Sequence, residues 1–293
     1  MKQFLAWWQL LRAGNALTAA SNVIAGYATA QFGWQPAWPL LVLVVASILL
    51  YEAGMLLNDV FDAERDAVER PERPIPSGRI SRRAAAAVGE GLLLAGVFAA
   101  GLASYLLESP WPAVVGVALA LCIVGYDAGL KNTPFGPWVM GACRLLNVLL
   151  GSTGAGASWL ADALRYALVV GLYAVGLTYY ARTENQYGST MSQVVGGTFV
   201  CGATFCVSYW VGKAMGNLLL IVVCWVSLNA FIWLDQGWFA PTGLTPPQHR
   251  RRVSRMIFGF LLMDALVVGW SPALVVLSLL VLAWIASRFA SMT

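Results

Sequence analysis

A dense run of charged residues, Asn58–Arg83 (NDVFDAERDAVERPERPIPSGRISRR), directly follows a long hydrophobic stretch. Asn58, Asp62 and Asp66 are spaced i, i+4 and i+8. Asp59 lies three residues before Asp62, so one continuous helix would place all four side chains on a single face. Carboxylates crowded together in this way need a cation among them. Mg²⁺ prefers oxygen ligands and is commonly held by one or two carboxylates plus substrate phosphates. The spacing therefore predicts a magnesium site.

A solvated loop whose acidic and basic charges cancel is the alternative interpretation of this run. Two features favour a functional site. The first four polar residues keep a regular helical spacing, and the run then breaks at Pro71, Pro74, Pro76 and Gly78, residue types that end helices and shape defined loops. Ionisable groups at the edge of a membrane span are also usually functional.

The sequence NDVFDAERD resembles the NDxxDxxxD motif of the UbiA superfamily of intramembrane prenyltransferases. The next stretch, RPERPIPSGRIS, is similar to the loop that follows this motif in many members, and the whole phrase looks closest to the UbiA-like EboC subgroup. The resemblance implies that Asp59, Asp62 and Asp66 are catalytic and, with Asn58, hold Mg²⁺. It also implies an all-α fold, a polytopic transmembrane helical bundle around a central cavity.

Polar residues inside hydrophobic segments are further candidates for substrate binding. Arg12 lies early in the first predicted span, where it could be a cationic partner for a diphosphate. An equal alternative is that its side chain only extends along the helix to the membrane interface. Asn22 lies deeper in that span, where an inward-facing role is expected. Arg144 and Asn147 lie one turn apart inside another span. A buried arginine needs a partner, and a phosphate or one of the aspartates would serve.

The segment Tyr126–Lys131 (YDAGLK) resembles the Y-x-x-x-L-K element of the family. The resemblance implies that Lys131 contacts the diphosphate or a second acidic motif, and the alternative is a charge that only sets topology. Asp127 departs from the small polar residue that is common at its position.

A larger departure occurs at Thr178–Asn185 (TYYARTEN), where the family carries a second motif of the DxxxD kind. This chain has a single carboxylate there, Glu184, which is the expected metal ligand, beside Arg182. Either Arg182 replaces a metal by binding phosphate directly with its fork of donors, or the site holds one Mg²⁺ and the chemistry is altered.

The elements that must position these residues are membrane spans. Of the 293 residues, 59% are hydrophobic and 11% are charged, against about 25% charged in soluble domains. Stretches of about 20 apolar residues can span a bilayer. They occur at 10–31, 38–59, 84–106, 111–128, 134–152, 163–181, 192–210, 214–234, 253–269 and 272–289. The last two could form one broken helix, so we expect nine or ten spans in a single domain, 1–293.

The basic residues predict the orientation of these spans. With ten spans, most lysines and arginines fall on the side of the acidic run, and the other side keeps only Arg165 and Lys213, apart from Arg144 inside a span. Positive charge is enriched on the cytoplasmic side. We therefore expect an integral protein of a bacterial inner membrane with its active site facing the cytoplasm.

The expected function is Mg²⁺-dependent transfer of a prenyl group from a prenyl diphosphate to an unidentified hydrophobic acceptor. Membrane lipid is the other expected partner, and nothing in the sequence suggests nucleic-acid binding. Two alternatives stay open. One is a UbiA-type terpene cyclase, which would use no acceptor. The other is a non-catalytic carrier or transporter of a prenyl lipid or metabolite, because a fold alone does not fix function.

Overall fold

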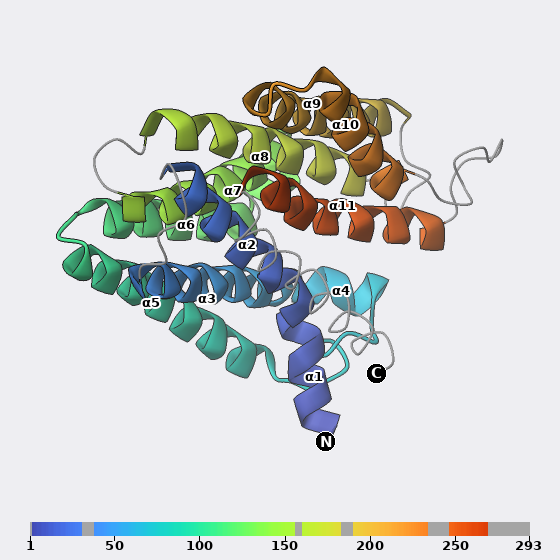
Figure 1. The fold of residues 1–293 in the computed structure, drawn as a ribbon. Helices are drawn as coiled ribbons and strands as arrows, with labels where there is room; N and C mark the ends of the chain where they lie inside the picture. The colour runs from blue at the N-terminus through green and yellow to red at the C-terminus, as the bar shows by residue number, and fades with distance from the viewer. Residues whose placement is uncertain (1, 31–37, 156–159, 183–189, 234–245, 269–293) are drawn as a thin grey trace.

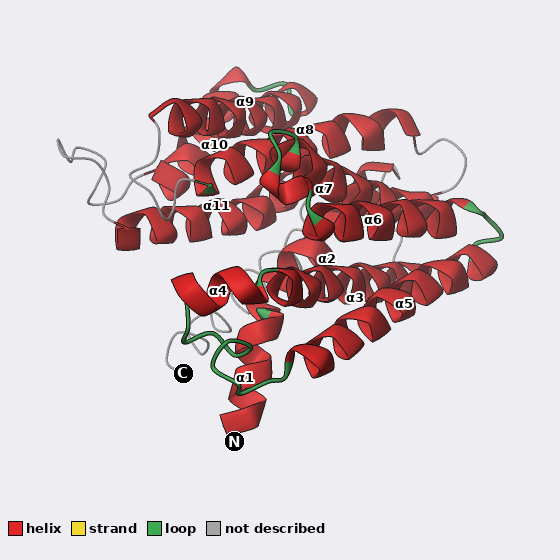
Figure 2. Ribbon diagram, turned by 180° about the vertical axis from the view of Figure 1, so that it is seen from behind, coloured by secondary structure: helices red, strands yellow, loops and turns green. Residues whose placement is uncertain are grey.

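The computed structural model describes residues 2–30, 38–155, 160–182, 190–233 and 246–268. These residues form α-helices, two short 3₁₀ turns and connecting loops, and they contain no β-strand (Figure 2). The predicted all-α fold is therefore confirmed. The helices are α1 (Lys2–Leu11), α2 (Ala13–Ala30), α3 (Trp38–Phe61), α4 (Ala63–Glu69), α5 (Arg82–Leu106), α6 (Trp111–Ala128), α7 (Gly136–Ser152), α8 (Leu160–Ala181), α9 (Thr190–Ala214), α10 (Leu218–Trp233) and α11 (Pro246–Val267).

Five stretches of helix in the described part of the chain are long and apolar enough to cross a membrane. They are Trp38–Phe61, Arg82–Leu106, Trp111–Ala128, Ala163–Ala181 and Met191–Ala214. Each coincides with a predicted span. Other predicted spans correspond to helices that are shorter or less apolar, and the span predicted at 272–289 lies outside the described residues. The number of spans, nine or ten, stays a prediction.

The first predicted span, 10–31, is not one uninterrupted helix. Helix α1 ends at Leu11 and α2 begins at Ala13, because Arg12 adopts a positive φ of 49°. Few non-glycine residues adopt this left-handed conformation. Arg12 therefore forms the bend between α1 and α2, and its side chain projects from this bend.

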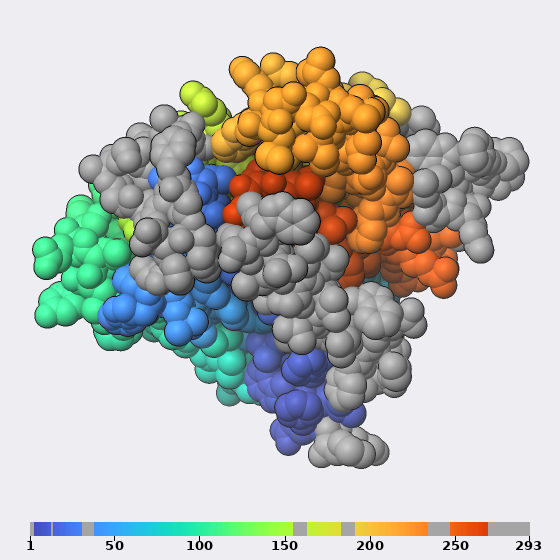
Figure 3. Space-filling view, viewed as in Figure 1, coloured from blue at the N-terminus to red at the C-terminus, as the bar shows by residue number. Residues whose placement is uncertain are grey.

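The bundle consists of closely packed helices that run side by side across the view of Figure 1. Glycines permit the closest approaches: a Cβ at Gly26 would overlap the carbonyl oxygen of Val148, and one at Gly151 would overlap that of Val23. Small residues at helix contacts let backbones approach within a membrane protein. This contact fixes α2 against α7, and both helices carry buried polar side chains, among them Asn22 and Asn147. Figure 3 shows α10 (orange) over α11 (red) on the outer face.

A second, smaller apolar core supports the charged run. It joins Leu10 of α1 and Leu56 of α3 to Ala63 of α4, and Ile75 and Ile80 of the following loop insert into it. The loop is thus anchored by its own apolar side chains on both sides of Pro76 and Gly78. Its path ends where Ser81 caps α5 by accepting a hydrogen bond from the Ala84 amide at 3.2 Å.

Candidate functional site

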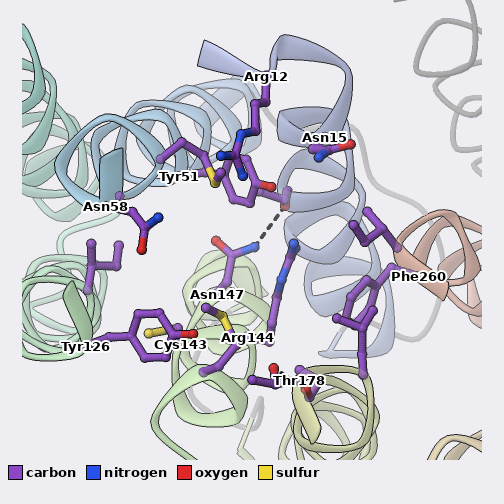
Figure 4. Close-up of a pocket in the computed structure, with 18 of the residues that line it drawn as sticks. Arg12, Asn15, Tyr51, Asn58, Tyr126, Cys143, Arg144, Asn147, Thr178 and Phe260 are labelled. Carbon is purple, nitrogen blue, oxygen red and sulfur yellow. Dashed lines mark hydrogen bonds between the residues drawn. The ribbon is translucent and has the colours of Figure 1, made fainter. Parts of the chain in front are cut away.

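A cavity of about 330 Å³ lies among α2, α3, α6, α7, α8 and α11 (Figure 4). Volumes from roughly 300 Å³ upward are typical of small-molecule sites. Most of the wall is apolar. We call the end next to the charged run the mouth and define it by Arg12, Asn58 and Asp127, which line the cavity there. A second hollow of about 460 Å³ adjoins the mouth, and Arg12 lines both.

Two aspartates of the motif share one guanidinium. Arg73, from the loop after α4, places Nη1 at 2.6 Å from Asp66 Oδ2 and at 3.4 Å from Asp59 Oδ1. Arg12 adds a second contact to Asp59, Nη2 to Oδ1 at 3.1 Å. Both aspartates are buried. Asp59 and Asp66 therefore form a pair that already holds a cationic group between them.

The other two motif residues share the ammonium of Lys131. Its Nζ lies 2.8 Å from Asp62 Oδ1 and donates a hydrogen bond to Asn58 Oδ1 at 3.0 Å. Lys131 comes from the turn between α6 and α7, so this contact connects that turn to the end of α3. Arg65 pairs with the second oxygen of Asp62 at 3.2 Å. The structure thus brings Lys131 to the first aspartate motif, whereas the resemblance implied the diphosphate or a second acidic motif as its partner.

The expectation of one continuous carboxylate face needs correction. Helix α3 ends at Phe61, and Asp62 is the cap of a new short helix, α4. The i to i+4 backbone hydrogen bonds from Asp62 to Asn58 and from Asp66 to Asp62 persist across this junction. The side chains nevertheless divide into the pairs Asn58 with Asp62 and Asp59 with Asp66, each around its own cation. No group of three or more His, Cys, Asp or Glu side chains in the described residues is placed to hold a metal ion.

The donor set at this motif still fits Mg²⁺. All of its donors are carboxylate or amide oxygens, and two carboxylates meet at Arg73 Nη1, which marks a place where two acidic residues bind one positive group. Mg²⁺ needs no more than one or two carboxylates when phosphate and water complete its shell. Asp59 and Asp66 would hold it, with Asp62 and Asn58 alongside.

Arg182, at the end of α8, binds main-chain carbonyl groups. Its Nη2 donates hydrogen bonds to the main-chain carbonyls of Lys131 and Thr133, at 2.6 and 2.8 Å. It is not among the residues that line the cavity. Arg182 therefore holds the turn that carries Lys131, and its binding of phosphate stays a prediction. Glu184, the other candidate at this place, lies outside the described residues.

Arg144 projects from α7 into the middle of the cavity, as Figure 4 shows. Its nitrogens donate to Asn22 Oδ1 at 3.1 Å and to Thr18 Oγ1 at 3.0 Å. The guanidinium also lies over the rings of Phe260 and Tyr51, at 4.6 and 5.2 Å from their centroids. These contacts are cation–π interactions. The predicted inward placement of Arg144 is therefore found, and its partners are polar and aromatic side chains.

Asn22 is fully buried behind Arg144 and does not belong to the described lining of the cavity. It donates to Asp264 Oδ2 at 2.8 Å while it accepts from Arg144. Asp264 also accepts hydrogen bonds from Ser21 and Tyr166, both at 2.5 Å. Because Asn22 is fully buried and bonded to both Asp264 and Arg144, it is placed to position Arg144, and its contact with substrate stays a prediction.

Sequence reasoning missed Asp264, although a signal was present. It is the one carboxylate in the predicted span 253–269, and an acidic residue inside a span usually has a specific partner. Asn147, which was predicted, lines the cavity from α7. It accepts a hydrogen bond from Ser47 at 2.6 Å and donates to the Ala19 carbonyl at 2.9 Å.

Comparisons with known proteins agree with this architecture. Residues 19–244 match the UbiA prenyltransferase family. The chain is 36% identical to a digeranylgeranylglyceryl phosphate synthase from Methanoregula boonei over 129 residues, which is 44% of each chain. It is 27% identical to the enzyme of the same name from Saccharolobus solfataricus over 223 residues, 74% of this chain and 75% of that one. The chain spans about half the length of the first curated relatives it matches.

Two solved structures share the fold. The apo structure of a UbiA homologue from Aeropyrum pernix K1 has a TM-score of 0.64 at 15% identity and covers 86% of this chain and 96% of that one. A structure described as giving insights into digeranylgeranylglyceryl phosphate synthase in membranes has a TM-score of 0.55 at 19% identity, with 92% and 99% covered. The EboC subgroup stays a prediction. The family match covers most of the chain and includes the aspartate motif, so this membrane protein belongs to the UbiA prenyltransferase family.

Proposed function

We propose that the chain transfers a prenyl group from a prenyl diphosphate to a hydrophobic acceptor, with Mg²⁺ as cofactor. One observation carries the proposal: the aspartate motif and Lys131 meet at the mouth of a largely apolar cavity. A prenyl diphosphate has the matching shape, with an anionic head for the mouth and an apolar chain for the wall. The relatives named digeranylgeranylglyceryl phosphate synthases support the same class of reaction.

The mouth would bind the diphosphate. Mg²⁺, when bound, supplies Lewis-acid stabilisation of the charge that develops on the departing phosphate oxygens. The chain supplies Asp59, Asp62 and Asp66 to hold that metal, and Lys131 and Arg12 to hold the phosphate oxygens. Lys131 is well placed for this role because its side chain is only 9% exposed and already lies at the motif.

The cavity would receive the prenyl chain and exclude water. Its wall includes Leu119, Ile123, Leu177 and Ile257. Transfer breaks the bond between the allylic C1 and the diphosphate oxygen and forms a bond from C1 to the acceptor. The acceptor atom releases its proton, which the departing diphosphate can take up. Positive charge develops at C1, and the ring of Tyr126, which lines the cavity beside Asp127, would stabilise it by a cation–π interaction.

Arg144 and Asn147 would orient the acceptor further inside the cavity. Both line it, and Arg144 retains donors beyond the two that its partners use. We propose that the mouth faces the cytoplasm of a bacterial cell and that the bundle lies in the inner membrane. The loop arginines next to the mouth support this orientation under the positive-inside rule.

The test uses the full chain in lipid nanodiscs with geranyl, farnesyl and geranylgeranyl diphosphate and Mg²⁺, with and without a lipid extract as acceptor source. Release of pyrophosphate that requires the extract, together with a prenylated lipid, is the expected result. Asp62→Asn should abolish release, and Glu90→Gln, on an exposed position of α5, should not. Cyclic product without extract would indicate a cyclase. Absence of release under every condition would indicate a carrier.

A further inference from the structure

Asp127 is a buried carboxylate that the proposed mechanism does not yet use. It lies one residue before the end of α6, lines the cavity at its mouth, and is only 4% exposed. Within the described part of the chain its side chain accepts no hydrogen bond and forms no ion pair. A buried charge without a partner is unfavourable. The position therefore calls for a ligand that the protein itself does not provide.

The surroundings of Asp127 indicate the charge of that ligand. The charges of Lys131, Asp62 and Asp59 all act on its carboxylate. Asn58 lines the same mouth, and its Oδ1 shares the Lys131 ammonium with Asp62. Asp62 is also paired with Arg65, and Arg12 lines the same mouth, so the negative charge that lacks an ion-pair partner among the described residues here is that of Asp127 itself. A cationic ligand beside Asp127 is therefore favourable, and an anionic ligand alone is not.

The donor types narrow the ligand to a hard cation. Carboxylate and amide oxygens suit Mg²⁺ and Mn²⁺, whereas softer metals prefer thiolate or imidazole ligands. Lys131 shows that two of these oxygen groups already converge on one positive atom. The opposite pair, Asp59 with Asp66, surrounds Arg73 instead. The mouth thus has two separate positions at which oxygen ligands bind a cation.

We propose that Asp127 is a ligand of a divalent cation at the mouth, together with Asp62 and Asn58, at a position distinct from that between Asp59 and Asp66. This inference rests on the proposed function, because the cation would bind together with the diphosphate. It also assigns a purpose to the departure of Asp127 from the small residue that the resemblance leads one to expect.

The experiment measures Mn²⁺ binding and needs no turnover. The full chain in nanodiscs is titrated with Mn²⁺ in the presence of inorganic pyrophosphate, and bound ion is counted by electron paramagnetic resonance. Wild type is compared with Asp127→Asn, which keeps the shape of the side chain, and with Glu90→Gln as a charge-matched control at an exposed position that does not line the cavity. Asp127→Ser is a second variant, to be used if the asparagine variant is not monodisperse.

Asp127→Asn or Asp127→Ser should weaken Mn²⁺ binding at least about tenfold or remove one bound ion, while Glu90→Gln matches wild type. Affinity and stoichiometry equal to wild type in the Asp127 variants would overturn the inference and leave the proposed function standing. Failure of wild type itself to bind Mn²⁺ with pyrophosphate would overturn both. A loss in Glu90→Gln equal to that in Asp127→Asn would show a general charge effect and also overturn the inference.

Discussion

The Arg182 guanidinium donates a hydrogen bond to the main-chain carbonyl of Lys131 at 2.6 Å. The end of α8 therefore fixes the turn from which Lys131 reaches Asp62, at 2.8 Å, and Asn58, at 3.0 Å. Three segments that are far apart in the sequence are connected in this way. The connection lets a residue outside the cavity control the position of a residue at its mouth.

Arg182→Gln should raise the KM for prenyl diphosphate, because Lys131 loses its fixed position while the reacting groups stay in place. We expect an increase of about three- to tenfold with a smaller change in kcat, since Arg182 is solvent-exposed and its hydrogen bonds are worth less there. Steady-state kinetics of pyrophosphate release would measure both constants. Arg182→Lys keeps the positive charge but lacks the several N–H donors of the guanidinium, so its KM should lie between those of wild type and Arg182→Gln.

An independent variant tests the same connection from the other side. A Cβ at Gly136 would overlap Arg182 Nη2, so Gly136→Ala should displace the guanidinium and reproduce the KM effect. An unchanged KM in both Gly136→Ala and Arg182→Gln would show that the connection does not position Lys131. Gly202→Ala is a matched control, because a Cβ there meets nothing within 4 Å.

Arg73→Met should destabilise the metal-free protein and make its stability more dependent on Mg²⁺. The substitution leaves Asp59 and Asp66 buried without the guanidinium that they share. Breaking a buried ion pair costs about 3–5 kcal/mol. We expect about half of that here, because the Arg73 side chain is 21% exposed. Thermal unfolding in EDTA and in Mg²⁺ measures the difference.

The control for Arg73→Met is Glu69→Gln, which removes an exposed ion pair of the same charged run. Arg65 and Glu69 lie 3.8 Å apart with side chains 52% and 45% exposed, so Glu69→Gln should change stability little. Mg²⁺ should raise the unfolding temperature of Arg73→Met more than that of wild type, because ligand binding to the folded state stabilises it. Equal shifts in the two proteins would argue against a cation position between Asp59 and Asp66.

Asp264→Asn should lower both stability and activity. Asp264 is fully buried and accepts hydrogen bonds from Ser21, Asn22 and Tyr166. An amide cannot accept all three bonds with two oxygens as the carboxylate does, so Asn22 would lose part of its support and Arg144 would shift. A fall of roughly 2–3 kcal/mol in the free energy of unfolding is expected.

Tyr166→Phe is the milder companion, because it removes one donor and leaves the carboxylate in place. If Asp264 positions Arg144, Asp264→Asn should lower the stability more than Tyr166→Phe does, and it should also raise the KM of the acceptor more. Loss of stability with an unaltered KM would limit the Asp264 cluster to a structural role.

The sequence predicts the all-α fold and the spans that the structure describes, because span length and apolar composition are local properties. The resemblance implies that Lys131 contacts the diphosphate or a second acidic motif, whereas the structure places it against Asp62 and Asn58 of the first motif. It does not predict that Arg73 lies between two aspartates, because several arginines in the loop could do so and only the apolar anchors Ile75 and Ile80 decide which one does. The partners of Arg182 are main-chain carbonyls, and every residue has one, so the residue types in the sequence cannot identify these partners. The Asp264 cluster was foreseeable in part, since a lone carboxylate in a span requires partners.

Gly151→Ala should destabilise the bundle through the contact between α2 and α7. The added methyl would overlap the Val23 carbonyl oxygen, which belongs to a backbone that cannot move aside as a side chain could. Overpacking of this kind costs about 1–3 kcal/mol, so we expect the unfolding temperature to fall by about 2–10 °C. Gly101→Ala meets nothing within 4 Å in the interior of α5, and it should be neutral or slightly stabilising because alanine favours helix. A similar fall in both variants would show that helix propensity and not the close backbone contact decides the outcome. A fall in Gly151→Ala alone, accompanied by weaker substrate binding, would show that this contact also places Arg144, which α7 carries toward Asn22 on α2.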